Sequence, residues 1–385
     1  LCRTMRIQFI KKKARWDFMQ QQHAERVYFF DAYRTIIVLS VLALHAAMSY
    51  MAYVPGWWYV INPEKSLFFL FWVLIVNTGD MPAIFFLAGY FAPRSLEKRG
   101  RMLFLKEKAL HIGIPWIVGV LAFAPLFAMA TWRSLNLPLP ETYMEFVRTI
   151  WLGPGYQQSH FWFLGVLMVF LIVFAAVGSP RAASGRSPLF WLAGWWGLSS
   201  AAFFLSSLYL HPDLWIRISH IYFQPARIVS YALAFYLGAR AWRDGWFDGP
   251  RPGFGAIALS GLATVAGSWS VIFLAMNFPV KETLALKALH GMSHSFASLS
   301  IAVFFLFLCR ALFDRPSPVW RTLSEASYGI YWLHQMILMP AVYLLIPWNL
   351  PIGIKFILAL GGTYILCAFL TIHGLKKLPV LRRLF

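Results

Sequence analysis

Long apolar runs, repeated along the whole chain, constrain how this sequence can fold more than any other feature. A helix needs about 20 predominantly apolar residues to cross the hydrocarbon core of a bilayer. Runs of that length recur throughout the 385 residues, of which 59% are hydrophobic and only 13% are charged. The sequence therefore predicts an all-α, polytopic integral membrane protein with about ten transmembrane helices. The predicted spans cover residues 33–54, 67–91, 112–131, 161–178, 189–210, 221–239, 254–276, 286–312, 327–346 and 352–373.

The distribution of Lys and Arg predicts which side of the membrane each loop faces. Ten crossings place both termini on one side, and cationic residues accumulate in cytoplasmic segments. The segments on the side of the termini carry 25 of the 34 Lys and Arg residues, whereas the opposite loops carry 7. We therefore expect both termini in the cytoplasm. The chain then divides into a basic N-terminal arm over residues 1–32, a transmembrane domain over 33–373 and a short basic tail over 374–385.

The net charge of +19 does not indicate a nucleic-acid partner. Its largest blocks, at residues 11–15 and 94–108, flank predicted spans, where cations contact anionic lipid headgroups. Some of these cations could instead hold the phosphates of a cytosolic ligand. The three cysteines have no paired spacing and predict neither a disulfide framework nor a metal cluster. The lipid bilayer is thus the expected partner, and a monomer and a homo-oligomer are both compatible with the sequence.

Arg34 and His45, on the first predicted span, form the first candidate functional site. An eleven-residue step on a helix returns a side chain to within about 20° of its starting direction, so the two residues share one stripe of the helix. Their separation along the helix axis is about 16 Å, which puts His45 near the middle of the apolar layer. Ionisable groups at that depth are costly and usually face a polar cavity. The pair therefore favours a functional site over a buried structural hydrogen bond.

Other polar residues inside the predicted spans indicate that the helices enclose a polar interior. Arg227 is explained equally well by a structural ion pair with Asp80 and by binding of a ligand. His290 and His294 have the i, i+4 spacing of two metal ligands, but no Glu or third His completes a recognisable set. We therefore predict no metal site and expect this pair to take part in helix packing.

Five features in a fixed order resemble the acyltransferase 3 family of membrane acyltransferases. They are the spacing of Arg34 and His45, MPAIFFLAGYF at 81–91, GIP at 113–115, HFWFL at 160–164 and SYGIYWLH at 327–334. The resemblance extends from about Arg26 to the C-terminus. Within the family, the segments 26–34, 159–164 and 378–385 most resemble the glucan succinyltransferase branch. Two positions depart from the family pattern, because Ala88 replaces a Ser and His111 replaces an Arg.

The resemblance implies a membrane O-acyltransferase of the cell inner membrane. Such an enzyme transfers an acyl group, acetyl or succinyl, from cytosolic acyl-CoA to a hydroxyl of an extracytoplasmic glycan. Acyl-CoA is then a donor substrate, and no cofactor is implied. The sugar hydroxyl needs a base as it attacks the thioester, and a neutral imidazole at His45 suits that role.

Three further residues complete the expected catalytic group. Arg34 is expected to hold a phosphate or carbonyl oxygen of the donor through its planar guanidinium. Asp31 either orients Arg34 or caps the N-terminus of the helix. His334 is a second acid or base, or a hydrogen-bonding partner. The mechanism predicts a polar cavity lined by His45 and His334, open inward near Arg34 and outward near Trp162.

The predicted substrate-binding residues are Arg227, His160 and Trp162, near the outer ends of their spans. A Trp at that depth is also typical of an interface anchor. The alternative function is a transporter or flippase whose intramembrane His and Arg residues bind an anionic substrate. No inverted repeat of hydropathy is evident, which counts against many transporter folds.

Overall fold

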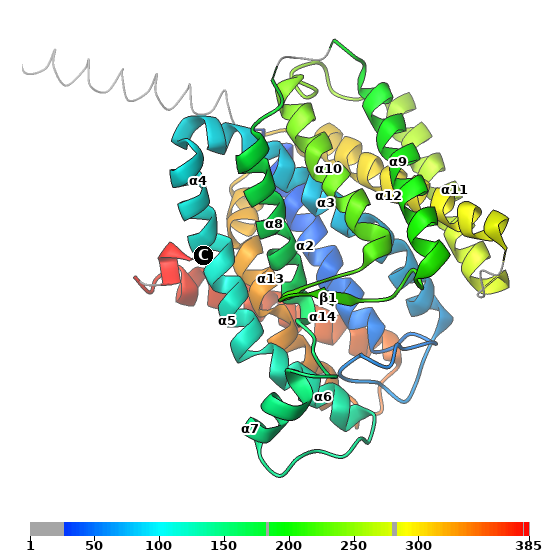
Figure 1. Cartoon of the computed structure of the whole chain (residues 1–385), viewed down its shortest axis with the longest axis vertical. Helices are drawn as coiled ribbons and strands as arrows, with labels where there is room; N and C mark the ends of the chain where they lie inside the picture. Colours follow the sequence, from blue (N-terminus) through cyan, green and yellow to red (C-terminus); the bar gives the residue numbers. More distant parts are fainter. Residues whose placement is uncertain (1–26, 182–184, 279–282, 380, 385) are drawn as a thin grey trace, which may run out of the picture.

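The helices assemble around α2 (Phe29–Met48), which lies in the middle of the molecule and is buried at 14 of its 20 residues (Figure 1). The computed structural model describes residues 27–181, 185–278, 283–379 and 381–384. The predicted basic arm therefore lies outside the described residues up to position 26. The other long helices are α3 (Leu67–Arg99), α8 (Trp162–Val177), α9 (Pro188–Tyr209), α10 (Pro225–Arg243), α11 (Phe254–Asn277), α12 (Leu284–Phe313), α13 (Pro318–Leu345) and α14 (Ile352–Leu370).

Shorter elements connect and flank these helices. A nearly continuous helical stretch comprises α4 (Arg101–Lys108), the π-helix η1 (Ala109–Gly113), α5 (Ile114–Ala122) and α6 (Ala124–Ser134). The next loop holds α7 (Tyr143–Phe146), the π-helix η2 (Val147–Trp151) and the 3₁₀-helix η3 (Ser159–Phe161). The strands β1 (Ile216–Ile218) and β2 (Ile221–Phe223) pair antiparallel, and η4 (Thr371–Leu375) and η5 (Leu381–Arg383) end the described chain.

Eight segments of the described chain are helical, long and apolar enough to cross a membrane, and they coincide with eight of the ten predicted spans. The other two predictions, at 221–239 and 327–346, fall on α10 and α13, which are helical but carry more polar residues. Several boundaries differ from the prediction, and α3 extends to Arg99 rather than ending at 91. α2 ends at Met48 rather than near 54, α10 begins only at Pro225, and α13 begins nine residues early, at Pro318.

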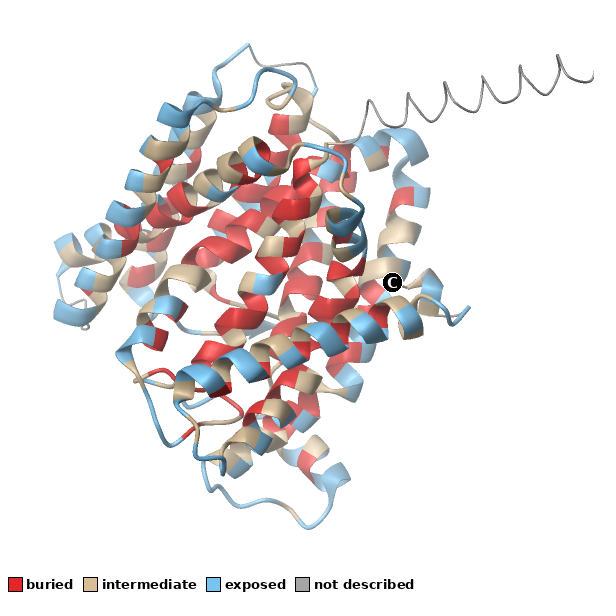
Figure 2. Ribbon diagram, turned by 180° about the vertical axis from the view of Figure 1, so that it is seen from behind, coloured by how far each residue is buried: buried red, intermediate tan, exposed pale blue. Residues whose placement is uncertain are grey.

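The buried residues gather in the centre of the bundle, whereas the outlying helices expose one side (Figure 2). On α11 the exposed residues are large and apolar, including Leu259 at 70% and Trp269 at 67% of full exposure. Such a face is stable against lipid tails and would be costly in water. The pattern is that of a multi-pass membrane protein whose core is built by α2, α3, α8, α10 and α13.

The closest helix crossing joins α3 and α10, where glycines let the two backbones touch. A Cβ placed on Gly89 would lie 1.9 Å from the carbonyl oxygen of Phe235, and one on Gly238 would lie 2.0 Å from that of Phe86. Small residues permit this approach in membrane helices, where backbone packing replaces the hydrophobic effect as the source of association. The crossing fixes α10, and with it Arg227, beside the core.

α3 continues through Pro82 because a neighbouring helix compensates for the proline. Pro82 cannot donate a hydrogen bond to the carbonyl of Thr78, one turn earlier. The hydroxyl of Ser298 on α12 donates to that carbonyl instead, at 2.8 Å. A buried backbone acceptor is thereby satisfied without water, as a membrane interior requires.

Two loops lie on the same side of the bundle: residues 49–66 and the segment 210–224, which contains the β1–β2 hairpin (Figure 1). The hairpin is tied to the loop before α8, because the hydroxyl of Tyr156 and the amide of Gln158 both donate to the carbonyl of His220. Arg217 also donates to the carbonyl of Leu152, at 3.4 Å. We call this side the loop side; it is the side predicted to face outward.

Candidate active site

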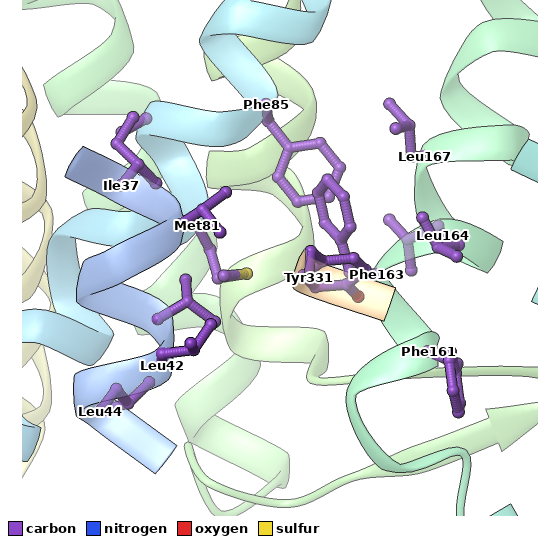
Figure 3. Close-up of a cluster of buried hydrophobic side chains, with 14 of the residues drawn as sticks. Ile37, Leu42, Leu44, Met81, Phe85, Phe161, Phe163, Leu164, Leu167 and Tyr331 are labelled. Atoms are coloured by element: carbon purple, nitrogen blue, oxygen red, sulfur yellow. The ribbon is translucent and has the colours of Figure 1, made fainter. Parts of the chain in front are cut away.

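A cavity of about 330 Å³ opens beneath these loops and reaches into the bundle. Its walls come from α2, α3, α8, α10 and α13, and from both covering loops. His45 and His160 line it together with Tyr331 and Gln335 of α13. Met81, Phe163 and Tyr331 converge on it from α3, α8 and α13 and supply an apolar wall (Figure 3). The site is therefore a mostly apolar chamber with a few polar groups, as ligand pockets usually are.

His45 and His334 form a hydrogen-bonded pair at the inner end of the cavity. Nδ1 of His45 lies 2.9 Å from Nε2 of His334, and Nδ1 of His334 lies 2.5 Å from the backbone carbonyl oxygen of Tyr331. A carbonyl oxygen can only accept, so Nδ1 of His334 carries the proton. In a neutral His334, Nε2 is then an acceptor, and Nδ1 of His45 must be the donor to it. The chain of bonds leaves the lone pair on Nε2 of His45.

The ring of His45 is also held from its other side. Trp58 stacks on it with ring centroids 5.8 Å apart and an angle of 12° between the planes. The indole N–H of Trp58 donates to the hydroxyl of Ser49 at 3.0 Å, which fixes the Trp in turn. Packing and hydrogen bonding together therefore restrict the imidazole to one orientation, as a positioned base requires.

His160 lies against the same pair, with ring centroids 4.5 Å from His334. Its Nε2 contacts the carbonyl of Trp332 at 3.2 Å and so donates to it, and its Nδ1 lies 3.2 Å from the hydroxyl of Ser159. That hydroxyl donates to Oε1 of Gln335 at 2.5 Å. The Nε2–H bond of His160 therefore joins η3 to α13 at the cavity wall, whereas Nδ1 is left as an acceptor beside a Ser159 hydroxyl whose one proton is donated to Gln335.

Arg34 lies on the far side of the bundle from the cavity opening. One guanidinium nitrogen donates to the hydroxyl of Ser324 at 3.4 Å, and the group lies 5.6 Å from the ring of Phe91. Arg34 is absent from the residues that line the cavity: on this stripe of α2 the lining ends at Val41, and the buried Val38 lies between Val41 and Arg34. The predicted cavity thus has its opening near Trp162, which lines it, but in this conformation it does not reach Arg34.

Asp31 stands in the first turn of α2, and the N-cap residue is Tyr28, which makes no side-chain capping bond. Of the two alternatives for Asp31, the capping of this helix is therefore wrong, since the helix begins two residues earlier, at Phe29; the orientation of Arg34 by Asp31 stays a prediction. A carboxylate in the first turn still interacts favourably with the positive end of the helix dipole.

Arg227 pairs with Asp213 rather than with Asp80. Its Nη2 lies 2.8 Å from Oδ1 of Asp213, in the segment before the hairpin. Arg227 is 8% exposed and lines the cavity, and its Nε has no hydrogen-bond partner among the described residues. Asp80 is buried elsewhere on α3, where it bonds Ser40. The structural pairing expected for Arg227 thus exists with a different partner.

His290 and His294 occupy a neighbouring polar cavity of about 220 Å³ between α3, α9, α11 and α12. Nε2 of His290 donates to the carbonyl of Phe278 at 3.3 Å, and the ring of His294 stacks on Phe203. No group of three or more His, Cys, Asp or Glu in the described parts of the chain could hold a metal ion.

Trp58, Ser159, Tyr331 and Gln335 contribute to the site but were not singled out from the sequence. Ser159 and Gln335 directly adjoin His160 and His334 in the sequence. Tyr331 lies one helical turn before His334. The sequence signal that could have identified Ser159, Tyr331 and Gln335 was therefore their closeness to His160 and His334 in the chain. Trp58 comes from a loop, and no periodic pattern predicts how a loop folds.

A bundle of long apolar helices that encloses a cavity lined by hydrogen-bonded histidines is the kind of site that a membrane-embedded enzyme has. Residues 27–372 match the acyltransferase domain of the acyltransferase 3 family, and the chain therefore belongs to this family and is a membrane acyltransferase. The family predicted from the five sequence features is thereby confirmed.

Similarity to individual proteins is more limited. The chain is 25% identical over 150 residues to glucans biosynthesis protein C of Escherichia coli O6:K15:H31 (strain 536 / UPEC). Proteins of the same name from Escherichia coli (strain K12) and Shigella dysenteriae serotype 1 (strain Sd197) match to the same degree. Each alignment covers 38% of this chain and 37% of the relative, well under half of either. No solved structure matches the chain.

Proposed function

We propose that this protein transfers an acyl group from cytosolic acyl-CoA to a hydroxyl of a glycan on the opposite face of the cell inner membrane. Both termini then lie in the cytoplasm, and the loop side faces outward. The observation that carries the proposal is the bond chain from the Tyr331 carbonyl through His334 to His45. It leaves an unprotonated imidazole nitrogen on the wall of a cavity that opens on the loop side.

The residues suggest a direct transfer with His45 as general base. The acceptor hydroxyl attacks the thioester carbonyl while Nε2 of His45 removes its proton. The resulting imidazolium keeps its Nδ1–H bond to His334, which stabilises the positive charge. When the tetrahedral intermediate collapses, the C–S bond breaks and the CoA thiolate leaves, taking up the proton from His45. His334 acts here as a positioning residue, comparable to the third member of a catalytic triad.

The donor is expected to approach from the side of Arg34. Its guanidinium can hold a phosphate or carbonyl oxygen with two parallel bonds, and it lies on the same helical stripe as His45. Because the cavity lining on α2 ends at Val41 and does not reach Arg34, the thioester reaches His45 only after helices on that side move apart. The conformation described here is then the one that receives the acceptor.

The acceptor is expected near Trp162, Arg227 and the wall formed by His160. The name of the relatives, glucans biosynthesis protein C, favours a glucan as this acceptor. The succinyl or acetyl group is the expected cargo, and acyl-CoA serves as a substrate rather than as a bound cofactor.

The proposal is tested with the purified full chain in lipid nanodiscs, supplied with acetyl-CoA or succinyl-CoA and a gluco-oligosaccharide. We expect release of free CoA thiol together with an acylated sugar detected by mass spectrometry. His45→Gln should lower the rate by about 10² to 10⁴-fold, because a general base contributes that much. The matched control is His373→Gln, at an exposed histidine outside the cavity. A transporter would move substrate across liposomes without releasing thiol, and that result would refute the proposal.

A further inference from the structure

A second hollow, a groove of about 820 Å³, lies between α6 and α13. Leu126, Ala130 and Arg133 line it from α6, at the three- and four-residue spacing of one helix face. Met336, Met339 and Tyr343 line it from α13 with the same spacing. Residues 59–61 of the loop after α2 form a third wall. The groove is open to the surroundings of the bundle, because Leu126 is 48% and Tyr343 is 65% exposed.

The groove has the length and the polarity of one half of a bilayer. α6 ends on the loop side, where the hydroxyl of Ser134 donates to the carbonyl of Trp58. The lining runs from Phe123 to Arg133, a rise of about 15 Å, which is half of a hydrocarbon core about 30 Å thick. It is apolar over most of this length, and its polar groups gather at the loop-side end. Such a groove fits an amphiphile with an apolar chain and a polar head.

Arg133 gives the polar end of the groove a positive charge. In the described chain it is the only Lys, Arg, Asp or Glu on the lining, and its guanidinium forms no ion pair or hydrogen bond with a described residue. The cavity beside His45 differs, because Asp213 balances the charge of Arg227 there. A planar guanidinium can hold two oxygens of one phosphate. The exposed, uncompensated cation at the end of an apolar groove therefore favours an anionic head.

Tyr59 connects this groove to the candidate active site, because it lines both hollows. Its ring lies 5.0 Å from that of Phe127, which also lines the groove, and 4.8 Å from that of Trp58. Trp58 in turn stacks on His45. An apolar chain in the groove thus supplies van der Waals contacts to the outer side of the wall that holds the imidazole.

We infer that the groove binds an anionic phospholipid from the leaflet on the loop side. One acyl chain lies between α6 and α13, and the phosphate lies on the guanidinium of Arg133. The lipid is a bound structural ligand that supports Tyr59. Because it lies outside the cavity of His45 and does not react, its binding is independent of the acyl-transfer chemistry.

The test is native mass spectrometry of the full chain in detergent, with one phospholipid added at a time. The probes are phosphatidylglycerol and phosphatidylcholine with identical acyl chains. We expect a saturable adduct of one lipid with a preference for phosphatidylglycerol, and a preference about fivefold smaller in Arg133→Gln, as loss of one cation beside an anionic headgroup causes. Arg148→Gln, at an exposed Arg of the same outer loop but outside the groove, is the matched control.

A second variant fills the groove. Ala130→Trp places a large ring between the two helices and should abolish the adduct of either lipid. Ala266→Trp, at an exposed position of α11 outside the groove, controls for the added Trp. Phosphatidylglycerol should also raise the melting temperature of the wild type more than that of Arg133→Gln, since a ligand of the folded state stabilises it.

Equal affinity of the wild type for the two lipids overturns the inference, as does an unchanged preference in Arg133→Gln or a wild-type adduct in Ala130→Trp. A dimer that Ala130→Trp dissociates would show that a second copy of the chain occupies the groove, and would also overturn it. If melting temperatures show that Ala130→Trp has lost its fold, Arg133→Gln decides. Lipid binding without release of thiol from acyl-CoA refutes the proposed function alone, whereas acyl transfer without a preference for the anionic lipid refutes this inference alone.

Discussion

The tautomer of His45 depends on a backbone atom that no mutation of a side chain removes. The carbonyl of Tyr331 holds the proton on Nδ1 of His334. Nε2 of His334 is then an acceptor, so Nδ1 of His45 must carry the proton that is donated to it. In the proposed mechanism, a base positioned in this way needs no carboxylate beside it, which avoids burying a charge in the membrane interior. The proposed roles are then divided: His45, which faces the cavity, is the base, and the fully buried His334 orients it.

Replacement of His334 should therefore impair turnover without impairing binding. We expect His334→Ala to lower kcat by about 10²-fold, since His45 loses its acceptor and its fixed tautomer. KM for the sugar should change little, because His334 is absent from the cavity lining. Steady-state kinetics separate the two constants. Equal changes in kcat and KM, or a lower melting temperature that explains the loss, would reduce His334 to a structural residue.

Arg34 should not be replaceable by Lys. The ammonium of Lys is a point charge that cannot hold two oxygens in one plane, so Arg34→Lys should raise KM for acyl-CoA nearly as much as Arg34→Ala. Arg181→Lys, at an exposed position in the loop between α8 and α9, serves as the control. If Arg34→Lys retains wild-type KM, the residue contributes only charge.

At the scale of elements, hydropathy predicted that helices exist but not where they begin. α10 starts at Pro225, a residue that suits the first turn of a helix, and the apolar residues before it pair as a hairpin turned at Ser219, whose φ is 54°. A sliding apolar window cannot distinguish these two structures. α13 starts after Ser317, whose hydroxyl accepts from the N–H of Trp320. That Ser-Pro signal was in the sequence but lay outside the apolar run.

The crossing of α3 and α10 gives a prediction about stability. A methyl group at Gly238 would lie 2.0 Å from a backbone oxygen of α3, so Gly238→Ala must push the helices apart. We expect a loss of about 1–3 kcal/mol, seen as a lower melting temperature in detergent. Gly194→Ala on α9 is the matched control, because nothing lies within 4 Å of its added methyl group. An unchanged melting temperature for Gly238→Ala would show that the crossing is looser than described.

For the whole molecule, the first test concerns orientation. In a chain whose three cysteines are replaced by alanine, we expect an impermeant thiol reagent added to intact cells to label Leu137→Cys but not Arg181→Cys. Leu137 lies in the loop after α6 and Arg181 in the loop after α8, and both are exposed. Permeabilised cells should label both positions, which shows that each thiol is reactive. The opposite pattern would invert the predicted topology.

The candidate site was partly predictable from the sequence because part of it lies on one helix. The spacing of Arg34 and His45 needs only helical periodicity. The predicted position of His45 in the middle of its span is wrong for α2, because the helix ends at Met48 and holds His45 in its last turn. The meeting of His45 with His334 joins residues 289 positions apart, which no local pattern encodes. The partner of Arg227 was missed for a similar reason, since Asp213 reaches it only after the segment before the hairpin folds back over the cavity.

The two valines between Arg34 and His45 have a consequence beyond the path of the donor. Cells keep a difference in ion concentration across such a membrane. A water-filled passage from one face to the other would let ions leak through and abolish that difference. Val38 and Val41 are both buried; Val41 borders the cavity, and Val38 lies beyond the cavity lining on the way to Arg34. An ion would have to leave water entirely to pass them, at a cost that keeps leakage negligible. In the proposed mechanism, the membrane then stays impermeable to ions while the acceptor binds.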